Sequence, residues 1–184
     1  MAALAPAAID KPSRLRQLQN GSVQPFMILK LLILLAMGNG TPVLAKVLLG
    51  DRLARPLDGG AVFVDGRPLF GPAKTIRGIL VSLVATPLAA WLIGLSWHLG
   101  VVLAALAIAG DLLSSFVKRR MGLALSSMAI GLDQIPESLL PLLGAPLFMP
   151  LSLLDVLVGM AIFFTGELIL SRILFHLNLR DRPY

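Results

Sequence analysis

The fold is decided by residues 99–120, which read LGVVLAALAIAGDLLSSFVKRR. Apart from Asp111, the run from 99 to 117 carries no charge. A helix of this length rises about 1.5 Å per residue and so crosses most of the hydrocarbon core of a bilayer. The stretch therefore predicts a membrane-spanning helix that ends in a cluster of basic residues.

The rest of the chain extends this pattern. Of its 184 residues, 57% are hydrophobic and 14% are charged, whereas about one quarter of a soluble domain is charged. Further apolar runs lie at 26–49, 76–97, 135–149 and 151–175. Each is long enough, or nearly so, to cross a bilayer as a helix. We expect an all-α integral membrane protein with about five transmembrane helices, in one domain over residues 26–184 that follows an N-terminal tail, residues 1–25.

Basic residues indicate the orientation of this protein in the cell membrane. The loop 50–76 carries four of them and positions 118–120 three, while the turns near 98–100 and 144–150 carry none. The positive-inside rule places the basic loops and the C-terminal Arg180 and Arg182 in the cytoplasm. With five spans, this orientation places the N-terminus outside the cell and the C-terminus inside. The tail contradicts it, because the tail also carries three basic residues. A first span that enters and returns would remove the conflict.

The composition excludes several kinds of site. The chain has no cysteine, which removes disulfides, thiolate metal sites and cysteine nucleophiles. One Tyr and two Trp are too few for a platform that stacks nucleic-acid bases. The excess of 16 basic over 10 acidic side chains instead indicates loops that face anionic headgroups or phosphorylated substrates.

Residues 38–42, Gly-Asn-Gly-Thr-Pro, interrupt the first apolar run. Glycine and proline here favour a broken backbone at membrane depth. Freed carbonyl groups and the Asn39 amide would then be available to a polar ligand. The alternative is a simple kink in which Asn39 bonds to a neighbouring helix.

The loop 58–78, DGGAVFVDGRPLFGPAKTIRG, ends at the start of the second apolar run. Backbone donors at a helix N-terminus, the Lys74 ammonium and the forked Arg77 guanidinium together suit a di- or triphosphate. It is not a Walker loop, because Pro72 and Ala73 separate Gly71 from the lysine. A topology signal without a ligand is the alternative.

In the third run, Asp111 shares a helix face with Ser114, Ser115, Lys118 and Arg119, because their offsets are 3, 4, 7 and 8. Asp111 lies about 10 Å deeper than Lys118. An unpaired carboxylate at that depth costs about 2.5 to 3.5 kcal/mol, so we expect a partner. A purely structural ion pair is the alternative to a catalytic group.

The segment 131–140, GLDQIPESLL, places Asp133 and Glu137 four residues apart on one face. Two adjacent carboxylates repel unless they are exposed or a divalent cation lies between them. Oxygen ligands beside phosphates indicate Mg²⁺. We expect Asp111, Asp133 and Glu137 to surround this ion. In the last run we expect Glu167 to be structural, with a partner such as Arg172.

Together these motifs resemble the CDP-archaeol synthase family, which is related to the CDP-diacylglycerol synthases. The family elements Asn-x-x-Pro-Val, Gly-x-x-Lys-Thr-x-Arg-Gly, Gly-Asp-x-x-x-Ser-Phe-x-Lys-Arg-Arg and Leu-Asp-Gln are matched by residues 39–43, 71–78, 110–120 and 132–134. Two departures are Pro136, with Glu137 as the next acid where members usually carry Asp, and Pro72-Ala73 in place of Asp-Gly.

The resemblance implies a cytidylyltransferase that makes a CDP-lipid and pyrophosphate from CTP and a glycerol-phosphate lipid of the cytoplasmic leaflet. It implies catalytic roles for Asp111, Lys118 and Asp133, with Mg²⁺ on Asp111, Asp133 and Glu137. Substrate would contact Asn39, Lys74, Thr75, Arg77, Ser115, Lys118 and Arg119. Two other functions are a small transporter for anionic solutes, which lacks the support of an inverted repeat, and a non-catalytic membrane subunit whose polar stripe holds helices together.

Overall fold

The computed structural model describes residues 23–125, 127 and 129–176. These residues form five α-helices and one short 3₁₀ helix. In chain order they are α2 (Pro25–Leu49), α3 (Ile76–Leu92), α4 (Trp97–Arg120), α5 (Gln134–Gly144), η1 (Ala145–Leu147) and α6 (Leu153–His176). The expected all-α fold is confirmed over the described ranges, where β structure is limited to two isolated bridges in the loop between α2 and α3. Most of the N-terminal tail, Arg180 and Arg182 lie outside the described residues.

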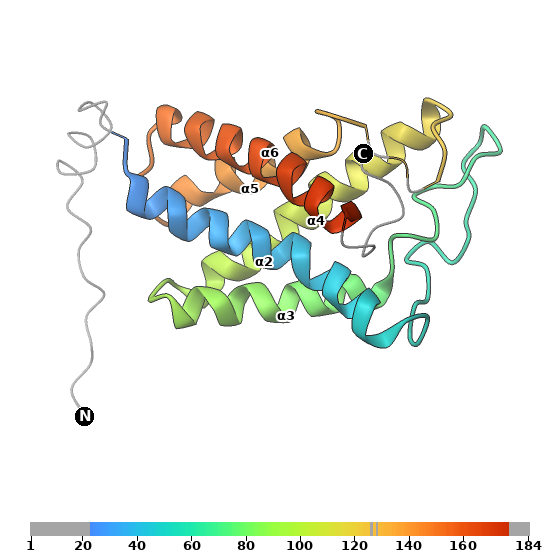
Figure 1. The fold of residues 1–184 in the computed structure, drawn as a ribbon, viewed down its shortest axis with the longest axis horizontal. Helices are drawn as coiled ribbons and strands as arrows, with labels where there is room; N and C mark the ends of the chain where they lie inside the picture. Colours follow the sequence, from blue (N-terminus) through green and yellow to red (C-terminus); the bar gives the residue numbers. More distant parts are fainter. Residues whose placement is uncertain (1–22, 126, 128, 177–184) are drawn as a thin grey trace.

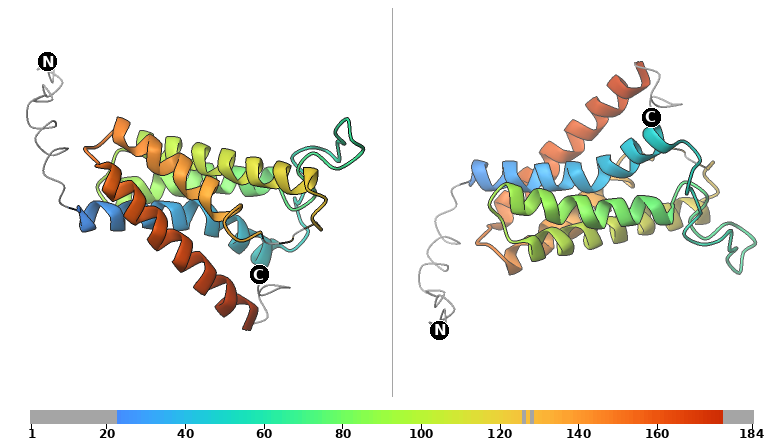
Figure 2. Two further views of the ribbon diagram at one scale, coloured as in Figure 1. Left: turned by 90° about the horizontal axis from the view of Figure 1, so that it is seen from above. Right: turned by 90° about the horizontal axis from the view of Figure 1, so that it is seen from below.

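The helices form an antiparallel bundle (Figure 1). The long loop 50–75 and the segment 121–133 lie at one end of this bundle, which we call the loop end. The short turns 93–96 and 148–152 lie at the other end. Helix α6 crosses the other helices obliquely (Figure 2). The basic residues of the loop 50–75 and those at positions 118–120, which precede the segment 121–133, therefore lie at the same end of the bundle.

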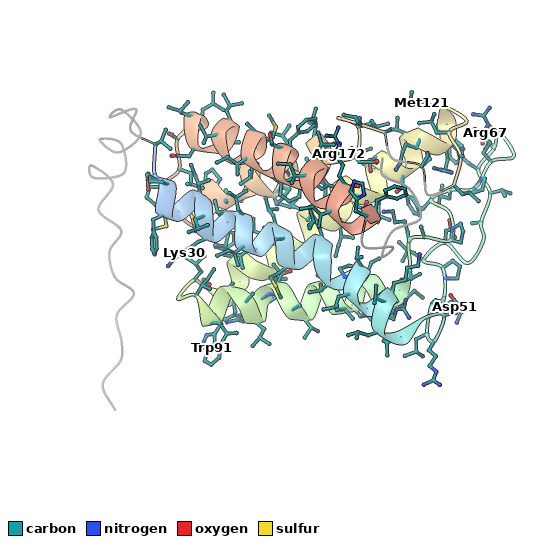
Figure 3. All side chains as sticks on the ribbon, in the orientation of Figure 1. Lys30, Asp51, Arg67, Trp91, Met121 and Arg172 are labelled. Atoms are coloured by element: carbon teal, nitrogen blue, oxygen red, sulfur yellow. The ribbon has the colours of Figure 1, made fainter. Side chains whose placement is uncertain are left out.

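Within the part of the chain that the structure describes, three helices are long and apolar enough to cross a membrane: α2, α4 and residues Leu153–Ile173 of α6. Helix α3 is also apolar, but its 17 residues span only about 25 Å. The predicted fourth run, 135–149, is not one helix, because α5 ends at Gly144 and η1 follows it. Trp91 and Trp97 are exposed near the end opposite the loops (Figure 3 labels Trp91), as in the aromatic belts of membrane proteins.

Helix α4 packs directly against its neighbours because two glycines face them. A Cβ atom at Gly100 would lie 2.5 Å from the Cα atom of Pro87 in α3. A Cβ atom at Gly110 would overlap the backbone of Pro136 and Glu137 in α5. The contact at Gly110 brings the start of α5 against the residue that precedes Asp111.

The predicted break in the first apolar run is wrong, because α2 continues through residues 38–42 and none of them has a positive φ. Pro42 has no N–H to donate to the carbonyl of Gly38. The Ser82 hydroxyl of α3 donates to this carbonyl instead, at 2.8 Å, and the Thr41 hydroxyl donates to the carbonyl of Met37 at 2.7 Å. A neighbouring helix thus satisfies the freed carbonyl and keeps the helix intact.

Candidate active site

The loop 50–75 is held together by Asp58. Its Oδ2 atom accepts the backbone N–H groups of Phe70 and Gly71, both at 3.0 Å, and its Oδ1 atom accepts that of Gly60 at 3.0 Å. Burial raises the pKa of Asp58, but these hydrogen bonds outweigh it and hold the pKa below its ordinary value of 3.8. The charged carboxylate therefore fixes the segment that leads into Lys74.

Lys74 and Asp111 form an ion pair between this loop and α4. The Lys74 ammonium lies 2.5 Å from Oδ1 and 2.6 Å from Oδ2 of the carboxylate. The next residue, Thr75, caps α3, because its side chain accepts the N–H of Gly78. The expected partner of the deep carboxylate is thus Lys74, and both side chains keep some exposure, 24% and 34%.

Lys118 and Asp133 form a second ion pair, between α4 and the residue before α5, with 2.6 Å between Nζ and Oδ1. The same ammonium donates to the carbonyl of Ser127 at 2.9 Å. The other carboxylate oxygen of Asp133 accepts the N–H of Ala129 at 2.9 Å. This pair closes the segment 121–133 onto α4.

The polar face predicted on α4 points into the protein, because Ser114, Ser115, Lys118 and Arg119 are all buried. The Ser114 hydroxyl donates to the carbonyl of Asp111 at 2.9 Å. Arg119 donates from Nη2 to the carbonyl of Ala124 at 3.0 Å, and its Nε is buried without a partner among the described residues. Arg119 therefore keeps a donor for a ligand.

Arg77 and Asn39 are two other residues that we expected to contact substrate. Arg77 is buried and donates from Nη1 to the carbonyls of Gly50 and Arg52, so that it closes the end of α2. Its Nε atom is buried without a hydrogen-bond partner among the described residues, so the expected contact of Arg77 with substrate stays a prediction. Asn39 has a buried Nδ2 atom that lacks a hydrogen-bond partner within the described ranges, which leaves this amide for a ligand.

The structure does not group Asp111, Asp133 and Glu137 as three ligands of one ion. Over the described residues there is no cluster of three or more Asp, Glu or His side chains that could hold a metal. Each of the two aspartates is instead paired with a lysine, Asp111 with Lys74 and Asp133 with Lys118. Glu137 is buried and interacts electrostatically with Asp111, Glu167, Asp133 and Lys74. Glu167 therefore belongs to the same charged region, which its local sequence did not indicate.

A third ion pair, which the sequence did not suggest, joins the loop to the end of α4. Arg120 lies 2.5 Å from Oδ1 of Asp65, and its guanidinium lies 4.8 Å and 5.0 Å from the ring centres of Phe63 and Phe116. Arg67 donates from Nη1 to the carbonyls of Arg119 and Arg120. These residues are more than 50 positions apart, so local periodicity has no means of pairing them.

The loop end thus combines carboxylates, which suit a divalent cation, with ammonium and guanidinium groups, which suit phosphates. Comparison with known proteins agrees with this chemistry. A family model described as CarS-like CDP-archaeol synthase matches residues 25–184. The CDP-archaeol synthase of Sulfurisphaera tokodaii is 34% identical over 140 residues, which cover 70% of this chain and 81% of that protein.

Two further comparisons agree. The CDP-archaeol synthase of Pyrobaculum aerophilum is 30% identical over 151 residues, 79% of this chain and 90% of that protein. A solved structure of an intramembrane enzyme for archaeal membrane lipid biosynthesis is 31% identical, with a TM-score of 0.60, and covers 76% of this chain and 91% of its own. The resemblance carried by the sequence motifs is confirmed, and the chain belongs to the CDP-archaeol synthase family.

Proposed function

We propose that the protein transfers the cytidylyl group of CTP to the phosphate of an isoprenoid-ether glycerol lipid and so makes a CDP-archaeol-like product and pyrophosphate. Family membership makes the chain a CTP-dependent nucleotidyltransferase that acts on a glycerol-phosphate lipid. The observation that carries the proposal is the placement of two lysine–carboxylate pairs, Lys74–Asp111 and Lys118–Asp133, at one end of an apolar helix bundle.

The reaction needs little acid–base chemistry. An anionic oxygen of the lipid phosphate attacks the α-phosphorus of CTP, and a new P–O bond forms. The bond from this phosphorus to the bridging oxygen of the β-phosphate breaks, and pyrophosphate leaves with the electron pair. Because the nucleophile is already ionised, the protein has to align the two phosphates and neutralise their charge.

We assign the phosphates to the cationic side chains of the site. Lys74 and Lys118 each hold a carboxylate in the structure and present ammonium groups that a phosphate can share. The Asn39 amide, buried and without a described partner, offers a donor to the lipid phosphate or to the nucleotide. Ser115, buried on the same face of α4, adds a hydroxyl.

The donor set fits Mg²⁺ although three carboxylates do not converge. This ion usually keeps several waters and binds one or two protein carboxylates together with substrate phosphates. Asp111 and Asp133 supply two such carboxylates, and Glu137 supplies a third acid within electrostatic range of both. When bound, the ion would neutralise charge that develops on the phosphates. The triphosphate would in turn neutralise the lysines that the aspartates release.

The basic loop end suggests the sidedness of the reaction. We propose that the chain crosses the cell membrane with its loop end in the cytoplasm, where the positive-inside rule places the basic loop 50–75 and the basic residues 118–120 at the end of α4. The lipid would enter sideways from the inner leaflet, with its headgroup at the loop end and its chains in hydrocarbon. This arrangement brings the membrane-bound lipid and the water-soluble CTP to one site.

The test uses the full-length protein, purified in detergent and supplied with CTP and Mg²⁺. One arm adds an isoprenoid-ether glycerol phosphate and the other a diacylglycerol phosphate. Pyrophosphate release in step with an ether CDP-lipid is the expected result, and a preference for the acyl substrate would reassign the lipid. Absence of any CDP-lipid, together with passage of anionic solutes through liposomes that contain the protein, would replace the proposal with a transporter.

A further inference from the structure

Arg67 and Arg119 are two of the arginines at the loop end that form no ion pair within the described ranges. Lys74, Lys118 and Arg120 each lie against a carboxylate. Among the described residues, no carboxylate lies within salt-bridge distance of Arg67 or Arg119. Asp133 interacts electrostatically with Arg119, but neither guanidinium group lies in direct contact with a carboxylate of the described residues, and this favours an anionic ligand between them.

Both of these arginines line one cavity of about 370 Å³, which lies within the roughly 300 to 1,000 Å³ range of small-molecule sites. Figure 3 shows Arg67 at the same end of the molecule as Met121, the residue after α4. The lining contains two positive charges and no acid. It consists of Arg67, Pro68, Arg119, Gly122, Leu123, Ala124 and Leu125.

Each arginine has a donor to offer. Arg119 is only 5% exposed, and its buried Nε has no partner among the described residues. A buried donor that stays unpaired costs about 1 to 3 kcal/mol, so a ligand that accepts from it gains affinity. Arg67 makes both of its side-chain hydrogen bonds to α4 from Nη1, which leaves Nη2 for a ligand. Forked guanidinium groups match the geometry of phosphate oxygens.

The residues that line the cavity adjoin Lys118 of the candidate active site along the chain. Arg119 follows Lys118 directly, and the cavity wall continues into the segment that contacts this lysine. The N–H of Leu123 donates to the Lys118 carbonyl at 3.1 Å, and the carbonyl of Ser127 accepts from the Lys118 ammonium. A chain of phosphates that begins at the Lys118–Asp133 pair can therefore end between Arg67 and Arg119.

We propose that Arg67 and Arg119 form a subsite for a pyrophosphate group. Under the proposed function, on which this assignment rests, the β- and γ-phosphates of CTP occupy the subsite before transfer and the released pyrophosphate occupies it afterwards. Arg67 thereby joins the substrate-binding residues, although within the loop 58–78 only Lys74, Thr75 and Arg77 were expected to contact substrate.

The test measures binding by the full-length protein in detergent, with EDTA and without lipid, so that it does not depend on turnover. Inorganic pyrophosphate, CTP and CMP are titrated against the wild type, Arg67→Gln and the control Arg55→Gln. Arg55 is an exposed arginine of the same loop and lies outside the cavity lining. We expect Arg67→Gln to weaken pyrophosphate and CTP at least about tenfold and to leave CMP unchanged, because CMP lacks the two outer phosphates.

Arg67 also caps the end of α4, so Arg67→Gln can lower stability for a structural reason. Arg67→Lys keeps a positive charge and one donor for the helix carbonyls but loses the fork. It should keep the melting temperature near that of the wild type and still bind pyrophosphate more weakly. Wild-type pyrophosphate affinity in Arg67→Lys, or an equal loss in Arg55→Gln, would overturn the subsite. A protein that binds pyrophosphate through Arg67 yet makes no CDP-lipid would overturn the proposed function instead.

Discussion

The ammonium group of Lys74 lies against both carboxylate oxygens of Asp111, at 2.5 Å and 2.6 Å. This contact joins a loop residue to a residue within an apolar helix 37 positions later. It gives the deep carboxylate the partner that an acid within a membrane requires. It also connects the loop that carries the basic residues to the helix that carries the polar face.

The first prediction concerns the stability of this pair. Lys74→Met should lower the free energy of unfolding by about 1 to 3 kcal/mol, because it leaves Asp111 charged without its partner. Adding Asp111→Asn should restore most of this loss, since the double variant has no unpaired charge. Thermal unfolding in one detergent measures both. If the two losses simply add, the pair does not stabilise the fold.

The second prediction concerns the activity of Asp111. Asp111→Asn keeps the size of the side chain and removes its charge, so we expect CDP-lipid synthesis to fall at least about 100-fold. The matched control is Asp51→Asn, which changes an exposed acid of the same end of the molecule (Figure 3) and should keep wild-type activity. Full activity in Asp111→Asn would remove this carboxylate from the mechanism.

A third prediction tests the hydrogen bond that keeps α2 continuous. Ser82→Ala should destabilise the protein by about 1 to 2 kcal/mol, because the Gly38 carbonyl loses its donor in a buried place. In a Pro42→Ala background the same change should cost less, since residue 42 then offers its own N–H to that carbonyl. Equal losses in both backgrounds, measured by thermal unfolding, would show that the bond does not compensate for the proline.

The fourth prediction concerns the close contact of α4 with α5. Gly110→Ala should strongly destabilise the protein or abolish its folding, because the added methyl group overlaps the backbone of Pro136. Gly166→Ala is the control, since a methyl group there meets nothing within 4 Å. The yield of monodisperse protein after detergent extraction distinguishes the two. A well-folded Gly110→Ala variant would mean that the helices can separate at little cost.

The fifth prediction concerns pH and the loop 50–75. The pKa of Asp58 is lower in the folded loop than its ordinary value of 3.8, so its carboxylate stabilises the loop above that pH. This contribution is lost as the pH falls through the folded pKa. Hydrogen-exchange protection of residues 60–71, relative to Asp58→Asn, should therefore begin to decrease as the pH falls below 3.8 and disappear only below the folded pKa. Protection that is the same in both proteins at neutral pH would contradict it.

The helical class and the polar face of α4 could be predicted from the sequence, because apolar length and helical offsets are local properties. The partners of this face could not. Lys74 and Asp111 were both expected at the site, but only the packing of α3 against α4 makes them an ion pair. The second pair, Lys118–Asp133, likewise depends on how the segment before α5 packs against α4.

The error at residues 38–42 has a similar origin. Glycine and proline within an apolar run weaken a helix considered alone, and this local effect favoured a break. The hydroxyl that replaces the missing donor belongs to Ser82, 44 residues away. The roles of Arg67 and Arg120 depend on equally distant contacts. Sequence periodicity identifies which residues are polar, whereas tertiary packing decides what they bind.

The two lysine–aspartate pairs have a consequence for biogenesis. Since each of these carboxylates already faces an internal countercharge, the helices can enter the lipid phase and assemble before any metal or nucleotide reaches them. A newly made chain would therefore fold independently of the local supply of CTP.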